Sequence, residues 1–388
     1  MNRKAWAYVA GGAGAEGTMH ENRAAFDRHR IVPRMLRGSE HRDLQVRLFD
    51  RLFPLPFFLA PIGVLDLVHQ SADVAAASAA AAEGVCFVAS SQSSVPLEEI
   101  ARSAGEGPRW FQLYWPSSND LMASFVERAE SADYEAIVVT VDTTELGWRP
   151  RDLDLGYLPF ARGRGIANYV TDPVFMRLVD RSPHEKRSGV PPLAGWLTIL
   201  ELIKNWPAGW QSAISDLGSV TRAIRCFTSL YSRPGLTWSD LSFLRSKTKL
   251  PILLKGILHP SDAIEALDRG ADAIIVSNHG GRQVDGAVGA LEVLPSVVRA
   301  VEDRVPVLFD SGVRTGADII KALALGAKAV LIGRPYVYAL AVGGETGVRE
   351  LIQNLAADID LNLGLAGYGN IAELSPQTLS ERILGQDI

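Results

Sequence analysis

The sequence has little cysteine, no excess of positive charge and no long apolar run. Its 388 residues include two cysteines, Cys86 and Cys226, without CxxC spacing or neighbouring histidines. Neither a disulfide framework nor a zinc site is therefore predicted. The formal net charge of -5 provides no basic face for nucleic acid. No apolar stretch approaches the roughly 20 residues that cross a bilayer, which argues against an integral membrane protein.

The N-terminus also lacks the apolar core of a signal peptide. It reads MNRKAW and soon reaches glycines, so secretion is disfavoured and a reducing, cytoplasmic location is expected. The hydrophobic fraction of 47% supports a sizeable core. A chain of 388 residues fits one barrel of roughly 250 residues with insertions, so we predict a single domain over 1–388.

A repeated unit of short apolar strand, turn and helical pattern is present instead. The helical patterns include 121–132 and 318–325, and the predicted strands are 57–62, 85–89, 110–114, 136–141, 251–256, 273–277, 305–309 and 329–332. Nearly unbroken apolar strands indicate parallel strands that are buried on both faces. The pattern predicts an α/β fold, a (β/α)8 TIM barrel. A doubly wound sheet is the alternative, but the APIG turn after the first strand is unlike GxGxxG.

Polar residues gather at the carboxyl ends of the predicted strands, where a barrel places its catalytic loops. They are Gly63, Ser90, Ser91, Gln112, Tyr114, Thr140, Asp142, Lys255, Ser277, His279, Arg282, Asp310, Arg314, Gly333 and Arg334. A polar residue at a single strand end would indicate little, because polar side chains in any βα loop can form hydrogen bonds to exposed backbone groups. Polar residues at all eight ends favour an active site at this face.

The turn SNHGGRQ, 277–283, carries the most distinctive chemistry. Asn278 and the paired glycines end a buried strand because they tolerate unusual backbone angles. His279 exchanges protons near neutral pH, and Arg282 offers a charged planar fork for a carboxylate. Together they suggest chemistry on an acid.

The alternation of strand and helix breaks over 155–236, far longer than an ordinary βα loop. This insertion after the fourth strand is aromatic-rich, with a helical stretch at 193–206. Trp196, Leu200, Ile203 and Trp206 form an apolar stripe there, which is more often a buried face than a membrane anchor. A lid or oligomer contact is the favoured interpretation, and a surface helix on a membrane is the alternative.

Two arginines follow the last two strands, in DSGVR (310–314) and IGRP (332–335). Loops at these barrel positions often bind phosphate, so we expect Arg314 and Arg334 to grip one; pairing with surface acids is the bland alternative. The phosphate could belong to a substrate or to a cofactor. Lys255, at the end of the fifth strand, favours a flavin cofactor, since a lysine there can stabilise a reduced ring. A snorkelling structural lysine is the alternative.

The sequence resembles the FMN-dependent 2-hydroxy acid oxidising family, which includes glycolate oxidase, flavocytochrome b2 and mandelate dehydrogenase. The motifs that carry the resemblance span almost the whole chain: YVAGG (8–12), APIG (60–63), FQLY (111–114), TVDT (140–143), LKG (254–256), SNHGGRQ, DSGVR and IGRP. Within the family, GWRPRD (147–152) and NYVTDP (168–173) most resemble lactate 2-monooxygenase.

The resemblance implies a role for each matching residue. His279 would be the base, with Asp142 bonded to its imidazole. Tyr8, Tyr114, Arg149 and Arg282 would bind the substrate carboxylate and 2-oxygen. The residues implied to hold FMN are Pro61, Ile62, Gly63, Ser91, Gln112, Thr140, Lys255, Ser277, Asp310, Gly312, Arg314, Gly333 and Arg334.

The resemblance also implies the reaction and the partners. A 2-hydroxy acid would lose two electrons and a proton to FMN, which passes the electrons to O2; hydride and carbanion routes both stay open. The products would be a 2-oxo acid and peroxide, or a decarboxylated acid. The alternative is a dehydrogenase that uses a quinone or protein acceptor, with or without association to a membrane. An isomerase is opposed by the pair of His279 and Arg282, and a non-enzymatic scaffold is least favoured. A homo-oligomer, a tetramer or larger, is expected.

Three features of the sequence bear on the substrate or on the electron acceptor. Gln92 stands where several relatives carry an aromatic residue, which leaves room for another group. Gly63 puts no side chain over the flavin, which favours easier access for oxygen, although dehydrogenases of the family can also carry glycine there. The insertion is longer than in the lactate 2-monooxygenase pattern, so lactate itself is in doubt as the substrate.

Overall fold

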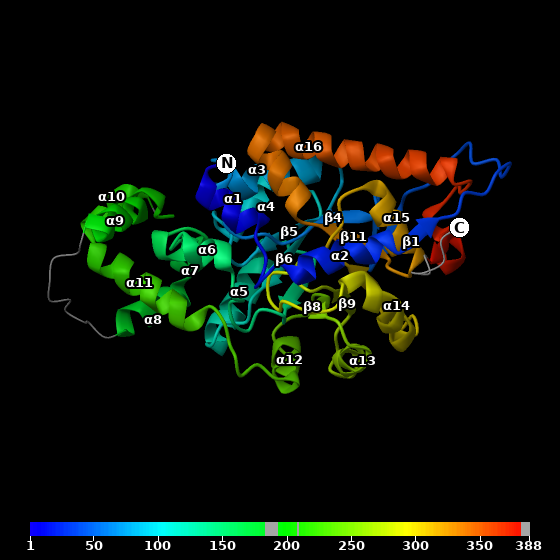
Figure 1. Cartoon of the computed structure of the whole chain (residues 1–388). Coiled ribbons are helices and arrows are strands. Elements are labelled where there is room, and N and C mark those ends of the chain that lie inside the picture. The colour runs from blue at the N-terminus through cyan, green and yellow to red at the C-terminus, as the bar shows by residue number, and fades with distance from the viewer. Residues whose placement is uncertain (183–192, 208, 382–388) are drawn as a thin grey trace.

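The computed structural model describes residues 1–182, 193–207 and 209–381 (Figure 1). Eight parallel strands close into a barrel in the order β10-β11-β4-β5-β6-β7-β8-β9. Their bounds are β4 (Phe57–Leu59), β5 (Phe87–Ser90), β6 (Arg109–Leu113), β7 (Ile137–Thr140), β8 (Ile252–Ile257), β9 (Ala273–Val276), β10 (Val307–Phe309) and β11 (Ala329–Ile332). The predicted TIM barrel is confirmed, and the doubly wound alternative is wrong. The first strand is shorter than predicted, ending before Pro61, which has no N–H to donate to a ladder.

A helix follows each strand and covers the outside of the barrel. These helices are α3 (Ala72–Ala82), α4 (Leu97–Ala104), α5 (Asn119–Ser131), α12 (Trp238–Arg245), α13 (Pro260–Asp268), α14 (Ala290–Val301), α15 (Gly316–Ala324) and α16 (Arg334–Leu365). The predicted helices at 121–132 and 318–325 correspond to α5 and α15. Alanines fill α3, which lets it pack closely against α16 and α4.

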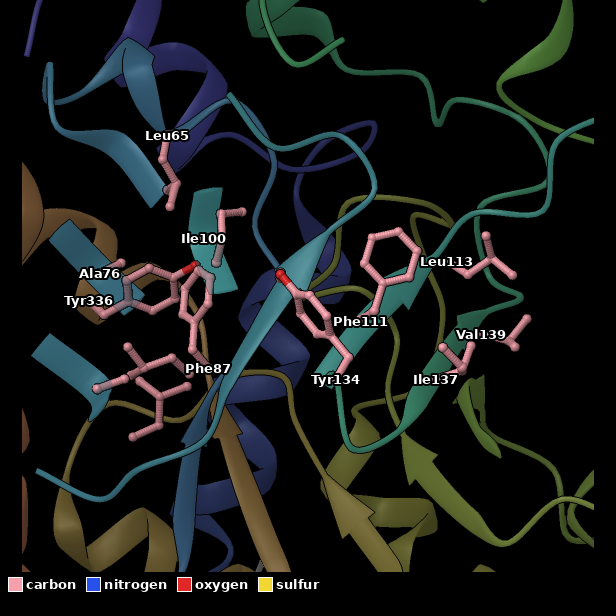
Figure 2. Close-up of a cluster of buried hydrophobic side chains, with 14 of the residues drawn as sticks. Leu65, Ala76, Phe87, Ile100, Phe111, Leu113, Tyr134, Ile137, Val139 and Tyr336 are labelled. Carbon is pink, nitrogen blue, oxygen red and sulfur yellow. The ribbon is translucent and has the colours of Figure 1, made fainter. Parts of the chain in front are cut away.

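The strand side chains alternate between two apolar clusters. The outward set packs under the helices, where the ring centres of Phe111 and Tyr134 lie 5.8 Å apart, and Phe87 and Tyr336 belong to the same cluster (Figure 2). The inward set fills the barrel and comprises Phe58, Val88, Trp110, Val138, Leu253, Ile275, Leu308 and Leu331. The hairpin of β2 (Val46–Leu48) and β3 (Arg51–Phe53) adds to this inner cluster and closes its amino-terminal end.

The same alternation builds the polar layer at the other end of the barrel. Side chains repeat their direction every second residue along a strand, so the residue two places after each inward apolar side chain also points inward. Those residues are Ala60, Ser90, Gln112, Thr140, Lys255, Ser277, Asp310 and Gly333. Six of the thirteen predicted cofactor residues therefore share one layer at the carboxyl-terminal mouth: Gln112, Thr140, Lys255, Ser277, Asp310 and Gly333.

The chain ends add further cover. The N-terminal helices α1 (Arg3–Ala10) and α2 (Gly17–Asp27) reach the turn after β9, because Ala13 N donates to Gly281 O at 2.9 Å. Strand β1 (His29–Ile31) pairs antiparallel with β12 (Leu379–Glu381) near the C-terminus.

The insertion between β7 and α12 is a group of helices whose outer members lie away from the barrel strands (Figure 1). They are α6 (Pro150–Asp154), α7 (Ala167–Val170), α8 (Pro173–Arg181), α9 (Leu193–Asn205), α10 (Trp210–Ser215) and α11 (Leu217–Leu230), with a 3-10 turn at Pro159–Arg162. The helix predicted at 193–206 is α9.

The predicted apolar stripe of α9 is only partly correct. Trp206 is buried and Ile203 is half-buried, but Leu200 is 61% exposed and Leu202 is buried instead. The side chain of Trp196 lies outside the described part. Within the chain that the structure describes, no helix is long and apolar enough to span a bilayer.

Candidate active site

A cavity opens at the carboxyl-terminal mouth of the barrel, with about 1170 Å³ of empty space when its opening to solvent is included. It lies where the eight strand ends converge, as barrel enzymes require. The predicted site residues that line it are Tyr8, Pro61, Ile62, Gly63, Tyr114, Arg149, Lys255, His279, Arg282, Asp310, Gly312, Arg314, Gly333 and Arg334. The remaining five, Ser91, Gln112, Thr140, Asp142 and Ser277, lie in or behind its wall.

His279, which lines this cavity, makes a short polar contact with Asp142 behind it. His279 Nδ1 lies 2.7 Å from Asp142 Oδ1. Burial lowers the pKa of His279 below its usual value, although Asp142 opposes this. Burial would raise the pKa of Asp142, but the charges of His279 and Lys255 outweigh it and hold the pKa at about 2. A neutral imidazole with a carboxylate behind it can accept a proton and stabilise the resulting charge.

The turn after β9 presents the imidazole through a strained backbone. His279 has φ of +58°, uncommon for a residue with a Cβ. Two side chains hold this turn: Ser277 Oγ accepts from His279 N at 3.0 Å, and Ser311 Oγ accepts from Gly280 N at 3.0 Å. Tyr114 Oη lies 3.5 Å from His279 Nε2, on the cavity side of the ring. The other imidazole nitrogen therefore faces the space where a substrate would bind.

Lys255 lies on β8, the strand that pairs with β9, and is almost fully buried. Its Nζ donates to Ser277 Oγ at 2.8 Å and lies 3.2 Å from Asp310 Oδ2 and 3.8 Å from Asp142 Oδ2. Burial disfavours its charge, but the two carboxylates outweigh burial and raise its pKa. The snorkelling alternative is wrong, because a charged ammonium is held inside the barrel mouth.

Two unpaired polar atoms test whether a flavin ring fits this layer. Among the described side chains, Gln112 Nε2 and Thr140 Oγ1 are buried and have no hydrogen-bond partner. They lie on adjacent strands, and Thr140 is in register with Lys255. A buried polar group without a partner is costly, so such groups indicate a missing ligand. The edge of a flavin ring carries carbonyl and N–H groups that match these atoms, and the site fits FMN.

Two arginines approach His279 from different loops. Arg282 Nη1 donates to the carbonyl oxygens of Tyr8 at 2.7 Å and Gly11 at 3.0 Å, and its guanidinium lies 5.1 Å from the Tyr8 ring centre. Burial and the charge of Arg149 lower the pKa of Arg282 to about 9, so Arg282 stays charged at neutral pH. Arg149 Nε donates to Arg282 O at 3.2 Å. The cavity therefore has two positive charges beside a proton acceptor, which suits a carboxylate.

The two arginines predicted to grip a phosphate differ in their surroundings. Arg314 lines the cavity, and its Nη1 donates to Val313 O at 2.7 Å. The donors of Arg334 instead meet backbone carbonyls, at 2.9 Å from Val9 and from Gly11 and 3.1 Å from Gly280. The Arg334 side chain thus joins α1 to the His279 turn. Its main-chain N–H opens helix α16, where an N-terminal turn attracts anions.

Sequence reasoning did not single out several residues of the site. Thr143 Oγ1 donates to Asp142 Oδ1 at 2.9 Å and lies 3.2 Å from His279 Nδ1. Gln283 Nε2 donates to Asp142 O at 2.9 Å, and its Oε1 accepts from Arg149 at 3.1 Å. Thr143 ends the motif TVDT and Gln283 ends the motif SNHGGRQ, so their positions in these motifs could have indicated that they belong to the site. Leu146, Phe160 and Tyr231 also line the cavity. The predicted lid placed the insertion over the mouth, but the sequence did not indicate which of its residues reach the cavity.

Gly63 has a steric reason beyond the access to oxygen that the sequence suggested. A Cβ built there would lie 2.9 Å from Gln92 O and 3.0 Å from Gln92 Cβ. Such contacts are too short for a side chain without a shift of the loop after β5. Glycine at 63 therefore allows the first two barrel loops to meet.

Comparisons with known proteins agree with this geometry. The sequence profile described as FMN-dependent dehydrogenase matches residues 1–381. The chain belongs to this family. An FMN-dependent alpha-hydroxy acid dehydrogenase of Penicillium citrinum is 42% identical over 96% of this chain and 85% of its own length. An L-lactate oxidase of Lysinibacillus sphaericus is 39% identical, over 96% of this chain and 87% of its own.

Solved structures of a family member extend the likeness to three dimensions. Mandelate oxidase with (S)-4-hydroxymandelic acid is 35% identical with a TM-score of 0.79, over 99% of this chain and 95% of its own. Another mandelate oxidase structure carries FMN as an adduct. The predicted family, cofactor and reaction class are confirmed: the chain is an FMN-dependent oxidoreductase acting on the CH–OH group of 2-hydroxy acids. The finer likeness to lactate 2-monooxygenase stays a prediction.

Proposed function

We propose that the enzyme is an oxidase that converts a 2-hydroxy acid with a bulky apolar side chain into the 2-oxo acid and passes the electrons to O2. The observation that carries this proposal is the 2.7 Å contact of His279 with Asp142 beside two cavity-lining arginines. A base next to paired positive charges suits a substrate with a hydroxyl group adjacent to a carboxylate.

Each residue has a part in this reaction. Arg282 and Arg149, with Tyr8, hold the carboxylate, and Tyr114 Oη bonds the 2-oxygen. His279 Nε2 accepts the hydroxyl proton or the α proton of the substrate, and Asp142 stabilises the imidazolium that forms. Bound FMN supplies the acceptor for the two electrons that leave the substrate.

The residues that would hold FMN fall into two groups. Ring and ribityl contacts come from Pro61, Ile62, Gly63, Ser91, Gln112, Thr140, Lys255 and Ser277. Asp310, Gly312, Arg314, Gly333 and Arg334 would hold the ribityl chain and phosphate. For Arg334 the contact is assigned to its main-chain N–H, because its side-chain donors meet Val9, Gly11 and Gly280.

The substrate side chain is assigned from the cavity wall that the insertion and its flanking loop supply. Leu146, Phe160 and Tyr231 line it, and the Phe160 and Tyr231 rings are 6.3 Å apart. Apolar and aromatic walls favour an aromatic or branched aliphatic side chain over a methyl group. The mandelate oxidase that resembles this chain was solved with (S)-4-hydroxymandelic acid.

A substrate panel tests this assignment. We expect kcat/KM for flavin bleaching to rise from lactate through branched aliphatic acids to mandelate-like acids. The rise should be roughly 10-fold for each additional methylene group or ring that packs against the cavity wall. The Phe160→Ala variant should reduce this preference, while Trp210→Ala, an exposed insertion residue, should preserve it. A panel in which lactate is the best substrate would contradict the proposal for the side chain.

The electron acceptor is tested separately. The enzyme is reduced anaerobically by its best substrate and then mixed with air. We expect rapid return of the oxidised flavin spectrum, with peroxide or carbon dioxide distinguishing simple oxidation from oxidative decarboxylation. A reduced flavin that persists for minutes in air would instead support a quinone or protein acceptor.

The homotetramer implied by the family resemblance is part of the proposal, and light scattering of the holoenzyme tests it.

A further inference from the structure

Asn168, in the NYVTDP motif of the insertion, makes more contacts with the barrel than the proposed chemistry requires. Its side chain is fully buried. Its Nδ2 donates to Ser90 O and Ser91 O, both at 3.2 Å, and to Ser93 Oγ at 2.9 Å. Its Oδ1 accepts from Leu97 N at 2.8 Å. The orientation of the amide is unambiguous, because Leu97 N is a donor and the other three partners accept.

The strand end that Asn168 holds determines which way Gln112 points. Ser90 Oγ donates to Gln112 Oε1 at 3.1 Å, and Ser91 N lies 3.4 Å from the same oxygen. Since both contacts act on the oxygen, Gln112 Nε2 must face the other way. That nitrogen is buried and, among the described atoms, has no partner. Gln112 therefore presents a preset N–H donor to the layer that fits the flavin ring.

Ser91, which Asn168 contacts, also connects to the substrate side of the site. Ser91 Oγ accepts from Tyr114 N at 3.2 Å. Tyr114 Oη lies 3.5 Å from His279 Nε2. A displacement of Ser91 would thus move both the donor that faces the ring and the hydroxyl that faces the substrate.

We infer that Asn168 is a positioning residue through which the insertion sets the hydrogen bond from Gln112 to the flavin, and so the flavin reduction potential. The inference rests on the proposed contact of Gln112 with the ring. An N–H donor to the ring stabilises its electron-rich reduced form, so a misaligned donor lowers the potential. The insertion thereby acts on the cofactor as well as on the substrate.

The experiment measures the midpoint potential, the flavin absorption spectrum and FMN occupancy of holoenzyme variants. Asn168→Leu removes all four contacts, and Asn168→Asp keeps the acceptor for Leu97 N but removes the donors. We expect near-normal FMN occupancy, a shifted spectrum and a reduced-to-oxidised ratio that falls roughly 10-fold at fixed potential, or about 30 mV for two electrons. Ser90→Ala, which breaks one link, should shift the potential in the same direction by less.

Asp172→Asn is the matched control. Asp172 is also buried in the insertion and binds Arg128 and Ser124 at 3.2 and 2.8 Å, without touching Ser90 or Ser91. We expect it to lower the unfolding temperature without changing the potential. If Asn168 variants do the same, or if they lose FMN, Asn168 has a structural role only and the inference is overturned.

Gln112→Leu distinguishes the two proposals. A normal potential in Gln112→Leu would overturn the proposed contact of Gln112 with the ring. If Gln112→Leu lowers the potential but the Asn168 variants do not, only the inference on Asn168 fails. In the double variant, Asn168→Leu should add no further shift to that of Gln112→Leu, because both act through one hydrogen bond.

Discussion

His279 combines a strained backbone with a lowered pKa, and both features favour its use as a base. Its φ of +58° is maintained by bonds to Ser277 and, through Gly280, to Ser311. Strain of this kind persists only where the surroundings determine the conformation, and it is frequent at active sites. Burial keeps the imidazole neutral at physiological pH, while Asp142 stabilises the charge that proton transfer creates.

Replacement of Asp142 by Asn should change the pH profile. The neutral imidazole is the active form. We therefore expect kcat/KM to decrease as the pH drops below the pKa of His279, which is lower than the usual histidine value. Asp142→Asn removes the charge that raises this pKa. The acid limb should therefore move to lower pH, while the plateau falls by roughly 100-fold because the imidazolium loses its partner.

Thr143→Val is the control for this profile, since Thr143 touches both residues without carrying charge. Its acid limb should move less than that of Asp142→Asn. An acid limb and a plateau that both stay unchanged in Asp142→Asn would show that Asp142 does not act on His279.

Replacement of Arg282 by Met should weaken substrate binding. Loss of hydrogen bonds to a charged group costs about 1.5–3 kcal/mol, which is roughly 10- to 150-fold in the apparent substrate constant. Arg151→Met is the matched control, because Arg151 pairs with Glu16 outside the cavity lining. Steady-state kinetics with the best 2-hydroxy acid measure both. Unchanged binding and turnover in Arg282→Met would mean that the carboxylate binds elsewhere.

Strand β8 shows how an element adapts to the site that it carries. Its register shifts between Lys255 and Ile257, and Gly256 in between has φ of +109°. A Cβ at Gly256 would lie 2.6 Å from Asp142 Cβ. Glycine there thus lets Asp142 lie against β8 while Lys255 keeps its place in the mouth.

Replacement of Gly256 by Ala should therefore affect stability and catalysis together. Backbone strain and overpacking are expected to cost about 2–4 kcal/mol, and displaced Asp142 should lower kcat. Gly105→Ala is the control, because Gly105 has φ of +54° but no atom within 4 Å of a built Cβ. Its unfolding should show the backbone strain alone, with normal kcat. Equal effects on kcat would refute the role of Gly256. Thermal unfolding and steady-state assays give both quantities.

At the scale of the whole molecule, the barrel carries a polar layer that its own side chains do not satisfy. Gln112 Nε2 and Thr140 Oγ1 have no partner in the part of the chain that is described, and Arg314 and Arg334 add charge at the same face. Folding should therefore be strongly linked to the cofactor, because a ligand that binds only the folded state stabilises it by mass action.

Added cofactor should accordingly raise the unfolding temperature of the apoprotein. FMN at one hundred times its dissociation constant adds about 2.7 kcal/mol to the free energy of unfolding. Riboflavin at the same concentration lacks the phosphate and should give a smaller shift, which differential scanning calorimetry would detect. Equal shifts from the two compounds would contradict a phosphate site at Arg314 and the start of α16.

Much of the protein was predictable because its determinants are local in the sequence. Apolar strand runs, turn residues and polar strand ends indicated the barrel and its catalytic face, and the motif around His279 indicated the reaction class. The first strand ended early because of Pro61, a local signal, whereas the error in α9 arose where neighbours in space decide the outcome. In α9, Leu200 is exposed and Leu202 is buried, which reverses the predicted apolar stripe at that point.

The sequence by itself determined the barrel and the family, and it predicted the proton acceptor, because alternation along each strand places polar residues in one layer whatever surrounds them. Only the tertiary structure decided which parts of the insertion reach the site. Phe160 and Tyr231 line the cavity, and Asn168 holds the end of β5. These contacts join residues far apart in the chain, and their partners are backbone carbonyls or packed rings that no local pattern records.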